Sequence, residues 1–309
     1  MPSYAYFHKK IVPIEEAKIG IMTHALHYGT GVFEGIRGNW NEEKKQMFLF
    51  RPKDHYDRLH QSCKILKIGL PYTSEELTRI TVELVEKCGF SEDIYVRPVA
   101  YKSSHVVGVR LHDLEDDFFA FVTPFGPYLD ITKGIKCGTS TWRRIDDTMI
   151  PPRAKITGLY VNSAIAKTEA HDNGYDEAIL LTYDGHVSEG SGENIFLIMK
   201  GKLVTPATSD NILEGITRET VIILAKEELG LETVERSIDR SELYLADECF
   251  MTGTAAHVTP VIEVDHRKVG SGEIGKITLT LQNLYFDVVR GRVKKYADWL
   301  LPLHSRIKA

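Results

Sequence analysis

Cysteine is scarce in this sequence, which contains only four cysteines among its 309 residues. No two of them form the C-x-x-C pair that zinc sites and thioredoxin-like redox sites use. A chain of this length buries roughly 75% of the surface that its unfolded form exposes, so it needs neither disulfides nor a structural metal for stability. We therefore expect reduced, mostly buried thiols and no metal site.

Long apolar runs and an excess of positive charge are also missing. No stretch approaches the roughly 18 apolar residues of a membrane span, and the N-terminal residues lack the apolar segment of a secretory signal. We therefore expect a cytoplasmic protein with no membrane partner. The 38 Lys and Arg residues against 43 Asp and Glu residues give a net charge of −5, which argues against nucleic acid as a partner.

Several common catalytic motifs are absent as well. The sequence has no G-x-S-x-G, H-E-x-x-H or Walker A pattern, which removes the usual signatures of hydrolases and ATPases. Residues 270–275, GSGEIG, match G-x-G-x-x-G by letter but follow a short turn near the C-terminus. A dinucleotide site needs a preceding strand and an acidic residue about 20 positions later. His24 and His27 lack further metal ligands nearby, so we interpret both as structural.

The remaining pattern is that of a mixed α/β protein without internal repeats. Pro124, Gly126 and Pro127 form a cluster that breaks helices and strands. We therefore expect a small N-terminal α/β domain at 1–124, a linker at 125–133 and a large C-terminal domain at 134–309. Strands are expected at 47–50, 95–101, 118–123, 177–182 and 195–199, and helices at 51–66, 74–88 (capped by Ser74), 159–173, 218–229 (closed by Gly230) and 278–296.

Five segments stand out in order along nearly the whole chain: HALHYGTGVFEGIR (24–37), RAKITGLYVNS (153–163), SEGSGENIF (188–196), LEGITRE (213–219) and MTGTAAHVTP (251–260). With this order and spacing the sequence resembles the fold-type IV pyridoxal phosphate enzymes, and within them the branched-chain amino-acid aminotransferases. The resemblance implies a two-domain fold-type IV architecture of the mixed α/β class and pyridoxal 5'-phosphate as the cofactor. We also expect a homodimer or a higher homo-oligomer.

Two turns of small residues, 215–217 and 253–255, expose backbone N–H groups and a hydroxyl. The first leads into an expected helix, whose N-terminus favours a phosphate. Threonine is also a common helix cap, so the residues alone leave an ordinary cap and a phosphate site both open. The resemblance favours the phosphate site and implies that it is made by Arg58, Ile216, Thr217 and Thr254.

Lys155, in the pattern K-x-x-G-x-Y-x-N-S, corresponds to the family's catalytic lysine, which forms a Schiff base with the cofactor. The resemblance also implies that the hydroxyl of Tyr160 bonds the phenolic oxygen of the cofactor. Glu189, which lies 34 residues after Lys155, would face the pyridine nitrogen and keep it protonated, so that the ring can act as an electron sink. Glu193 could compete for this role, and without the resemblance each glutamate is typical of a turn or a cap.

The resemblance further implies a substrate pocket with apolar and phenolic walls, which suits a branched side chain. Arg97 at the rim of this pocket would meet the side-chain carboxylate of glutamate, whereas Tyr95 would hold the α-carboxylate. Without the resemblance, alternating Tyr and Val positions indicate ordinary core. The residues assigned to the pocket are Tyr28, Phe33, Gly35, Arg37, Tyr95, Arg97, Val107, Val109, Tyr128, Thr254 and Ala255.

Some positions depart from the family pattern. Leu159 stands between the lysine and the tyrosine where a smaller residue is usual, Phe125 stands where tryptophan is frequent, and VVGV at 106–109 replaces a more glycine-rich loop. Residues 110–112 form an Arg-x-His motif like that of D-amino-acid aminotransferases, a few positions too late. The expected activity is transamination between L-leucine, L-isoleucine or L-valine and 2-oxoglutarate. A D-amino-acid or (R)-amine transaminase, or an aminodeoxychorismate lyase of the same fold, is the alternative.

Overall fold

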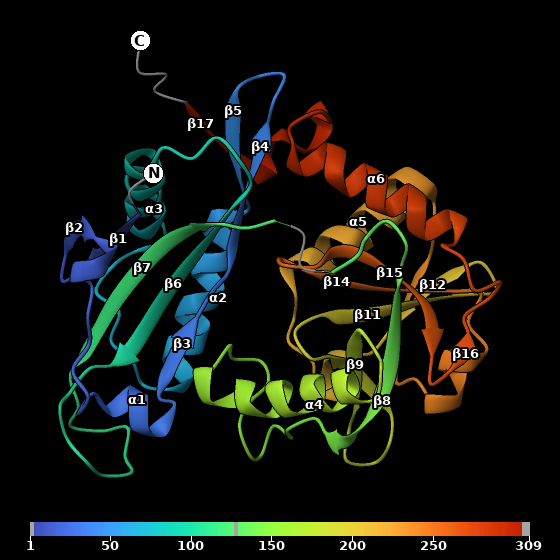
Figure 1. The fold of residues 1–309 in the computed structure, drawn as a ribbon, viewed down its shortest axis with the longest axis horizontal. Coiled ribbons are helices and arrows are strands. Elements are labelled where there is room, and N and C mark those ends of the chain that lie inside the picture. The colour runs from blue at the N-terminus through green and yellow to red at the C-terminus, as the bar shows by residue number, and fades with distance from the viewer. Residues whose placement is uncertain (1–2, 127–128, 305–309) are drawn as a thin grey trace. The chain divides into compact units, whose positions relative to one another are not determined.

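The computed structural model describes residues 3–126 and 129–304, which form two compact units (Figure 1). Unit 1 contains Met1–Gly126 together with two later segments, Ala154–Gly158 and Asp287–Ala309. Unit 2 contains Pro127–Arg153 and Leu159–Phe286. The mixed α/β class and the two-part architecture expected from the sequence are both present.

Unit 1 is built on an eight-stranded sheet in the order β17-β5-β4-β6-β7-β1-β2, with β3 paired to β6. Helices α2 and α3 pack against each other and against strands of this sheet (Figure 1). The strands of unit 1 are β1 (Tyr4–Phe7), β2 (Lys10–Pro13), β3 (Gly31–Phe33), β4 (Ile36–Asn41), β5 (Gln46–Phe50), β6 (Ile94–Lys102), β7 (Asp116–Pro124) and β17 (Leu300–His304). Its helices are α1 (His24–Tyr28), α2 (Pro52–Ile65) and α3 (Ser74–Cys88), with 3-10 turns η1 (Ile14–Glu16) and η5 (Lys294–Trp299).

Local sequence explains why α3 begins and ends where it does. The side chain of Thr73 accepts a hydrogen bond from the backbone N–H of Glu76, and the Glu76 carboxylate accepts one from the N–H of Thr73. The expected cap at Ser74 is therefore wrong by one residue, because Thr73 has the extended backbone that a cap requires. The helix ends at Gly89, whose φ of 67° is the left-handed conformation that glycine adopts without strain.

The expected domain boundaries place everything after residue 133 in one domain. The structure instead places two later segments, Ala154–Gly158 and Asp287–Ala309, in unit 1. Strand β17 pairs antiparallel with β5 and so becomes an edge strand of the first sheet. Ile156 forms an isolated bridge with Val32, which fixes the segment that contains Lys155 onto β3. Both contacts join residues more than 100 positions apart, and such pairings leave no local pattern in a sequence.

Unit 2 is built on a nine-stranded sheet in the order β10-β9-β8-β15-β14-β11-β12-β13, with β16 paired to β15. Helix α4 packs on β8 and β9, and helix α5 packs on β13 and β14. The strands are β8 (Ile135–Arg143), β9 (Glu177–Leu181), β10 (Val187–Gly190), β11 (Asn194–Met199), β12 (Lys202–Thr205), β13 (Thr233–Glu235), β14 (Glu248–Gly253), β15 (His257–Val264) and β16 (Arg267–Lys268). The helices are α4 (Tyr160–Asp172), α5 (Ile216–Leu229) and α6 (Lys276–Val289), with 3-10 turns η3 (Thr208–Asp210) and η4 (Arg240–Tyr244). The turn η2 (Thr157–Leu159) and the last residues of α6 cross the boundary between the two units in the sequence.

The last helix is shorter than the sequence suggests. Helix α6 ends at Val289 instead of continuing to Tyr296, because Gly291 takes a φ of 69° and donates its N–H to the carbonyl of Val288. Helix α5 ends at Gly230 as expected. All four cysteines are buried. Among residues 3–126 and 129–304, no helix combines the length and the apolar character that crossing a bilayer would need.

Candidate functional site

A fully buried carboxylate organises the predicted site residues of unit 1. Glu34, directly after β3, accepts hydrogen bonds from Nε and Nη2 of Arg58 at 2.7 and 2.8 Å, and one from Nδ1 of His55 at 2.7 Å. Burial opposes ionisation of Glu34, but the charge and hydrogen bonds of Arg58, with those of His55, lower its pKa well below the usual range. Arg58 is thus held in one orientation by a bidentate ion pair. Arg58 was expected from the sequence, whereas Glu34 was not, although Glu34 lies in the motif segment 24–37.

Lys155 lies beside the same helix and strand. Its backbone carbonyl accepts a hydrogen bond from the N–H of Phe33 at 3.0 Å, and its own N–H donates to the hydroxyl of Ser62 at 3.2 Å. The Nζ atom of Lys155 lies 5.1 Å from the centre of the Phe33 ring. His55, Arg58 and Ser62 follow one another at spacings of three and four along α2, so one face of this helix serves both Glu34 and Lys155.

A pair of glycines fixes the segment that follows Lys155. A side chain at Gly29 would approach the Cα of Gly158 to 2.6 Å, and Gly29 also has a left-handed φ of 62°. The hydroxyl of Thr157 donates to the carbonyl of Gly29 at 2.9 Å. Close backbone approach therefore anchors Lys155 from its C-terminal side as well.

Four of the predicted substrate residues gather around strand β6. Tyr95 and Arg97 alternate onto one face of this strand, and Nη2 of Arg97 donates to the Tyr95 hydroxyl at 3.1 Å. The guanidinium carbon of Arg97 lies 4.4 Å from the ring centre of Phe33 and 5.1 Å from that of Tyr95. A Cβ at Gly35 would lie only 1.9 Å from the Tyr95 hydroxyl, so Gly35 leaves the space that this hydroxyl occupies.

Other predicted substrate residues lie elsewhere. Arg37 is buried on β4, where its Nη2 donates to the carbonyl of Gly126 at 3.3 Å. The hydroxyl of Tyr28 accepts a hydrogen bond from the N–H of Gly108 and so holds the loop that contains Val107 and Val109. These two valines are 76% and 89% exposed, so in the single chain they are open to solvent.

The remaining expectations for unit 1 concern one tyrosine and two histidines. Tyr128 lies outside the described residues. His24 is buried and bonds Thr30 and the carbonyl of Gly108, whereas His27 is exposed and bonds the carbonyl of Ile21. Both histidines have structural partners. The part of the chain that the structure describes contains no cluster of three metal-ligating side chains.

In unit 2 a second buried carboxylate, Glu189, is held from three sides. Its Oε1 pairs with Nη2 of Arg144 at 2.6 Å, and its Oε2 accepts hydrogen bonds from Nδ2 of Asn194 at 3.0 Å and the N–H of Leu213 at 3.1 Å. A carboxylate with a cationic partner and two N–H donors is stabilised in its ionised form. Asn194 lies in a quoted segment, but no motif pointed to Arg144 as its partner.

The competing carboxylate, Glu193, has a different environment. It is buried, and the hydrogen bond recorded for its side chain comes from the N–H of Gly192 at 3.0 Å. None of the described residues forms an ion pair with it. Burial, followed by the negative charge of nearby Glu177, raises the pKa of Glu193 to about 8.

The predicted phosphate residues of unit 2 lie at the start of α5 and after β14. Helix α5 begins at Ile216, and its N-cap residue is Gly215, which has no side chain that could cap the helix. Thr217 in its first turn is buried, whereas Thr254 and Ala255 in the turn after β14 are partly exposed. Tyr160 is the first residue of α4.

Helix α6, which follows the GSGEIG segment, contrasts with α5. The carboxylate of Glu248 accepts hydrogen bonds from the N–H groups of Ile277 and Thr278 and from the Thr278 hydroxyl. A protein carboxylate therefore already takes the position of an anion at the start of α6. At helix α5 the N-cap residue provides no capping side chain, and the N–H groups of the first turn and the Thr217 hydroxyl suit a phosphate.

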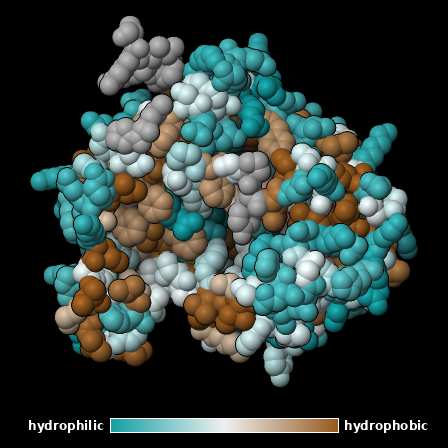
Figure 2. All heavy atoms as spheres, viewed as in Figure 1, coloured by the Kyte–Doolittle hydropathy of each residue, from teal (hydrophilic) through white to brown (hydrophobic). Residues whose placement is uncertain are grey.

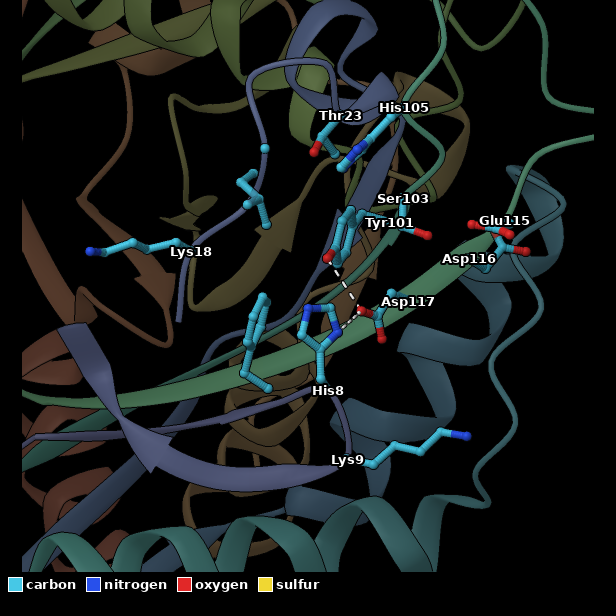
Figure 3. Close-up of a pocket in the computed structure, with 13 residues that line it drawn as sticks. His8, Lys9, Lys18, Thr23, Tyr101, Ser103, His105, Glu115, Asp116 and Asp117 are labelled. Carbon is cyan, nitrogen blue, oxygen red and sulfur yellow. Dashed lines mark hydrogen bonds and ion pairs between the residues drawn. The ribbon is translucent and has the colours of Figure 1, made fainter. Parts of the chain in front are cut away.

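A pocket of about 880 Å³ opens elsewhere in unit 1 and does not contain the predicted site residues (Figure 3). Asp117 in this pocket pairs with His8 at 3.0 Å and accepts a hydrogen bond from the Tyr101 hydroxyl at 3.4 Å. The residues that line it are Phe7, His8, Lys9, Lys18, Ile19, Gly20, Thr23, Tyr101, Ser103, His105, Glu115, Asp116 and Asp117.

Comparisons with known proteins give consistent results. A family described as amino-transferase class IV matches residues 31–264. A probable branched-chain-amino-acid aminotransferase of Aquifex aeolicus is 53% identical over 98% of this chain and 97% of its own length. The crystal structure of the Thermoproteus uzoniensis branched-chain aminotransferase with norvaline has a TM-score of 0.94 and 45% identity, and covers 98% of this chain and 100% of its own. The Thermobaculum terrenum branched-chain amino acid aminotransferase in its PLP-form has a TM-score of 0.94 and 39% identity, with coverages of 98% and 99%.

Proposed function

Because the chain belongs to the class IV aminotransferases, and within them to the branched-chain-amino-acid aminotransferases, we propose that Lys155 is its catalytic lysine. The enzyme depends on pyridoxal 5'-phosphate and is a transferase of class EC 2.6.1. It transfers the amino group between branched-chain L-amino acids (leucine, isoleucine and valine) and 2-oxoglutarate, which gives branched-chain 2-oxo acids and L-glutamate.

The donor groups of the chain fit this cofactor. The start of α5, with no side-chain cap, offers N–H groups and a hydroxyl to a phosphate. Glu189, beside Arg144, offers an ionised carboxylate to a protonated ring nitrogen. When bound, pyridoxal 5'-phosphate supplies a carbonyl carbon for the amino group and a ring that withdraws the electrons released at the substrate Cα.

In the proposed roles, Lys155 would move the proton between the substrate Cα and the cofactor carbon that receives the amino group. Glu189 holds a proton on the ring nitrogen, and the Tyr160 hydroxyl donates to the phenolic oxygen. Arg58, fixed by Glu34, holds the phosphate together with Thr217, Thr254 and the N–H of Ile216.

The proposed substrate roles divide the two carboxylates of glutamate between two groups. Tyr95, with the amides of Thr254 and Ala255, binds the α-carboxylate that all substrates share. Arg97, with Tyr28 and Tyr128, binds the side-chain carboxylate of glutamate. The branched side chain is assigned to a pocket with Phe33, Gly35 and Arg37 on one side and Val107 and Val109 on another, and the apolar contacts come from Phe33 and the two valines.

The observation that most strongly supports these roles is the environment of Glu189. Its two oxygens meet an arginine, an amide and a backbone N–H, contacts that favour the ionised form of a carboxylate, and its position 34 residues after Lys155 matches the family interval. The stacking of Arg97 between the rings of Phe33 and Tyr95 supports the division of substrate roles.

The decisive experiment concerns Lys155. Reduction of the holoenzyme with borohydride followed by peptide mapping should find the cofactor on Lys155, and the Lys155→Ala variant should lose transamination while it keeps its fold. Lys202→Ala is the matched control, because Lys202 is 52% exposed and pairs with Glu232 at the surface. Cofactor found on any other lysine would overturn the assignment.

A second measurement separates the proposed substrates from those of related enzymes on this fold. L-leucine, D-alanine and (R)-1-phenylethylamine are added separately to the holoenzyme, and the absorbance of the bound cofactor is followed. L-leucine should change this absorbance fastest. A faster response to D-alanine or to the (R)-amine would favour the alternative specificity.

We also propose that the enzyme is a homodimer or larger homo-oligomer and works in the cytoplasm. Apolar side chains are exposed over α1 and the loop beside it, at the lower left of Figure 2, and they include Ile21, Leu26, Val107 and Val109. Association of subunits would cover these side chains. The four buried, free cysteines suit a reducing compartment. Light scattering on the purified holoenzyme measures the number of subunits.

A further inference from the structure

Asn194 touches both of the places where the proposed site would hold the cofactor in unit 2. It is the first residue of β11 and is buried. Its Nδ2 donates to Oε2 of Glu189 at 3.0 Å and to the carbonyl of Leu213 at 2.8 Å. Both hydrogens of the amide are therefore used, one on the carboxylate and one on the segment that leads into α5.

The other end of the amide packs against the start of α5. The Oδ1 atom of Asn194 lies 2.1 Å from the position that a Cβ on Gly215 would take. Gly215 has φ −73° and ψ 135°, values that any residue adopts, so backbone conformation does not require glycine here. The space taken by Asn194 requires it.

Two further bonds close the same network. The N–H of Leu213 donates to Oε2 of Glu189 at 3.1 Å, and Nε of Arg144 donates to the carbonyl of Asn211 at 3.3 Å. Segment 211–215 is thus tied directly to Glu189 and to both of the side chains that hold this carboxylate. Because these groups are largely buried, removal of one partner leaves others without a hydrogen bond.

We propose that Asn194 is a positioning residue that sets Glu189 and the N-terminus of α5 relative to each other. One amide would then fix the spacing between the group at the ring nitrogen and the groups at the phosphate. This inference rests on the proposed roles of Glu189, Ile216 and Thr217. Its distinguishing consequence is that a change at Asn194 disturbs both ends of the bound cofactor, whereas a change at either end disturbs that end alone.

The test uses the full-length chain and two probes that each resemble one end of the cofactor. Inorganic phosphate reports on the α5 end, and pyridoxal, which lacks the phosphate, reports on the ring end. Asn194→Ala should lower the affinity for both probes by about 10- to 100-fold, the range expected for loss of a hydrogen bond to a charged group. Glu189→Gln should weaken only pyridoxal, and Thr217→Ala only phosphate.

A spectroscopic measurement and a second variant guard against a general loss of structure. In the holoenzyme of Asn194→Ala, the pH at which the bound cofactor changes its absorbance should shift, because Glu189 has lost a donor. Gly215→Ala disturbs the same contact by placing a methyl group against the Asn194 side chain. This variant should lower the affinity for phosphate and shift the same spectral titration. Thr252→Val is the matched control, since Thr252 is buried opposite Asn194 on β14 and its hydroxyl has no hydrogen-bond partner among the described residues.

The outcomes distinguish this inference from the function on which it rests. In one outcome, Asn194→Ala and Gly215→Ala bind both probes and titrate like the wild type, while Glu189→Gln and Thr217→Ala act as expected. This outcome would overturn the positioning role alone. Normal binding by Glu189→Gln and Thr217→Ala would overturn the proposed cofactor roles, and the inference with them. An effect of Thr252→Val as large as that of Asn194→Ala would show that any change in this strand pair acts, and would also overturn the positioning role.

Discussion

Two glutamates four residues apart, Glu189 and Glu193, show that two buried carboxylates of one short segment can have very different environments. Both lie where β10 turns into β11, and both are about 95% buried. Glu189 has Arg144 at 2.6 Å and two N–H donors, whereas Glu193 has one backbone N–H and the repulsion of Glu177. Burial therefore does not decide the charge of a carboxylate; the partners on its oxygens do.

Two arginines of unit 1, Arg58 and Arg97, also differ in the partners that hold them. Arg58 is held by both oxygens of Glu34, so its position is fixed by the protein. Arg97 forms no ion pair with a described residue and is held instead by the rings of Phe33 and Tyr95 and the Tyr95 hydroxyl. A cation stacked on rings keeps its affinity for a carboxylate that arrives with a ligand.

The largest expected effect comes from removing the charge of Glu189. Glu189→Gln weakens only the ring end, so its phosphate contacts should keep the complete cofactor bound, unlike pyridoxal, which lacks the phosphate. The proton-transfer half-reaction should slow by roughly 10² to 10⁴, because the ring nitrogen loses the carboxylate that keeps it protonated. Single-turnover absorbance changes with L-leucine measure this rate directly.

Glu193→Gln is the matched control for this comparison. Glu193 is proposed to be already protonated near neutral pH, so an amide in its place should leave the half-reaction within a fewfold of the wild type. If Glu193→Gln were slow and Glu189→Gln normal, the roles of the two glutamates would have to be exchanged.

Local signals explain why much of the fold was predictable. The glycine that ends α5 and the alternation that buries Phe118, Ala120 and Val122 of β7 are encoded within a few residues, whereas the start of α3 was expected one residue too late. The pairing of β17 with β5 and the attachment of 154–158 to β3 depend on residues far apart in the chain. No period or spacing indicates such contacts, so the expected domain boundaries lacked them.

The site divides in the same way. Lys155 and Glu189 lie in segments that resemble a known family, and Arg58 corresponds to a residue of that family, so their roles are predictions from the resemblance. Their partners had no such signal. Arg144 meets Glu189 across 45 positions, and Glu34 meets Arg58 across 24, in contacts that only the folded backbone creates.

A smaller effect is expected from Arg97, because it serves one substrate only. Arg97→Ala should weaken the binding of glutamate and 2-oxoglutarate by about 1.5 to 3 kcal/mol, the contribution of one charged hydrogen bond, and leave the binding of L-leucine unchanged. Single-turnover kinetics on each half-reaction separate the two substrates, which steady-state values mix. Equal weakening of leucine and glutamate would mean that Arg97 holds the α-carboxylate, and the pocket would then have the opposite orientation.

The smallest effect concerns stability and tests Glu193 itself. Its pKa is raised from 4.5 to about 8 on folding, so between these values the folded chain holds a proton that the unfolded chain has lost. The contribution of Glu193 to stability is therefore fully present below the pKa of the unfolded chain, 4.5. It is lost as pH rises through the pKa of the folded chain, about 8, by at most about 1.4 kcal/mol per pH unit. Glu193→Gln removes this proton exchange, so the difference in unfolding free energy between wild type and variant should move against the wild type from about pH 6 to about pH 7. Urea unfolding of both proteins at the two pH values measures the difference. Parallel pH dependences would mean that Glu193 is ionised in the folded chain, and its contrast with Glu189 would then disappear.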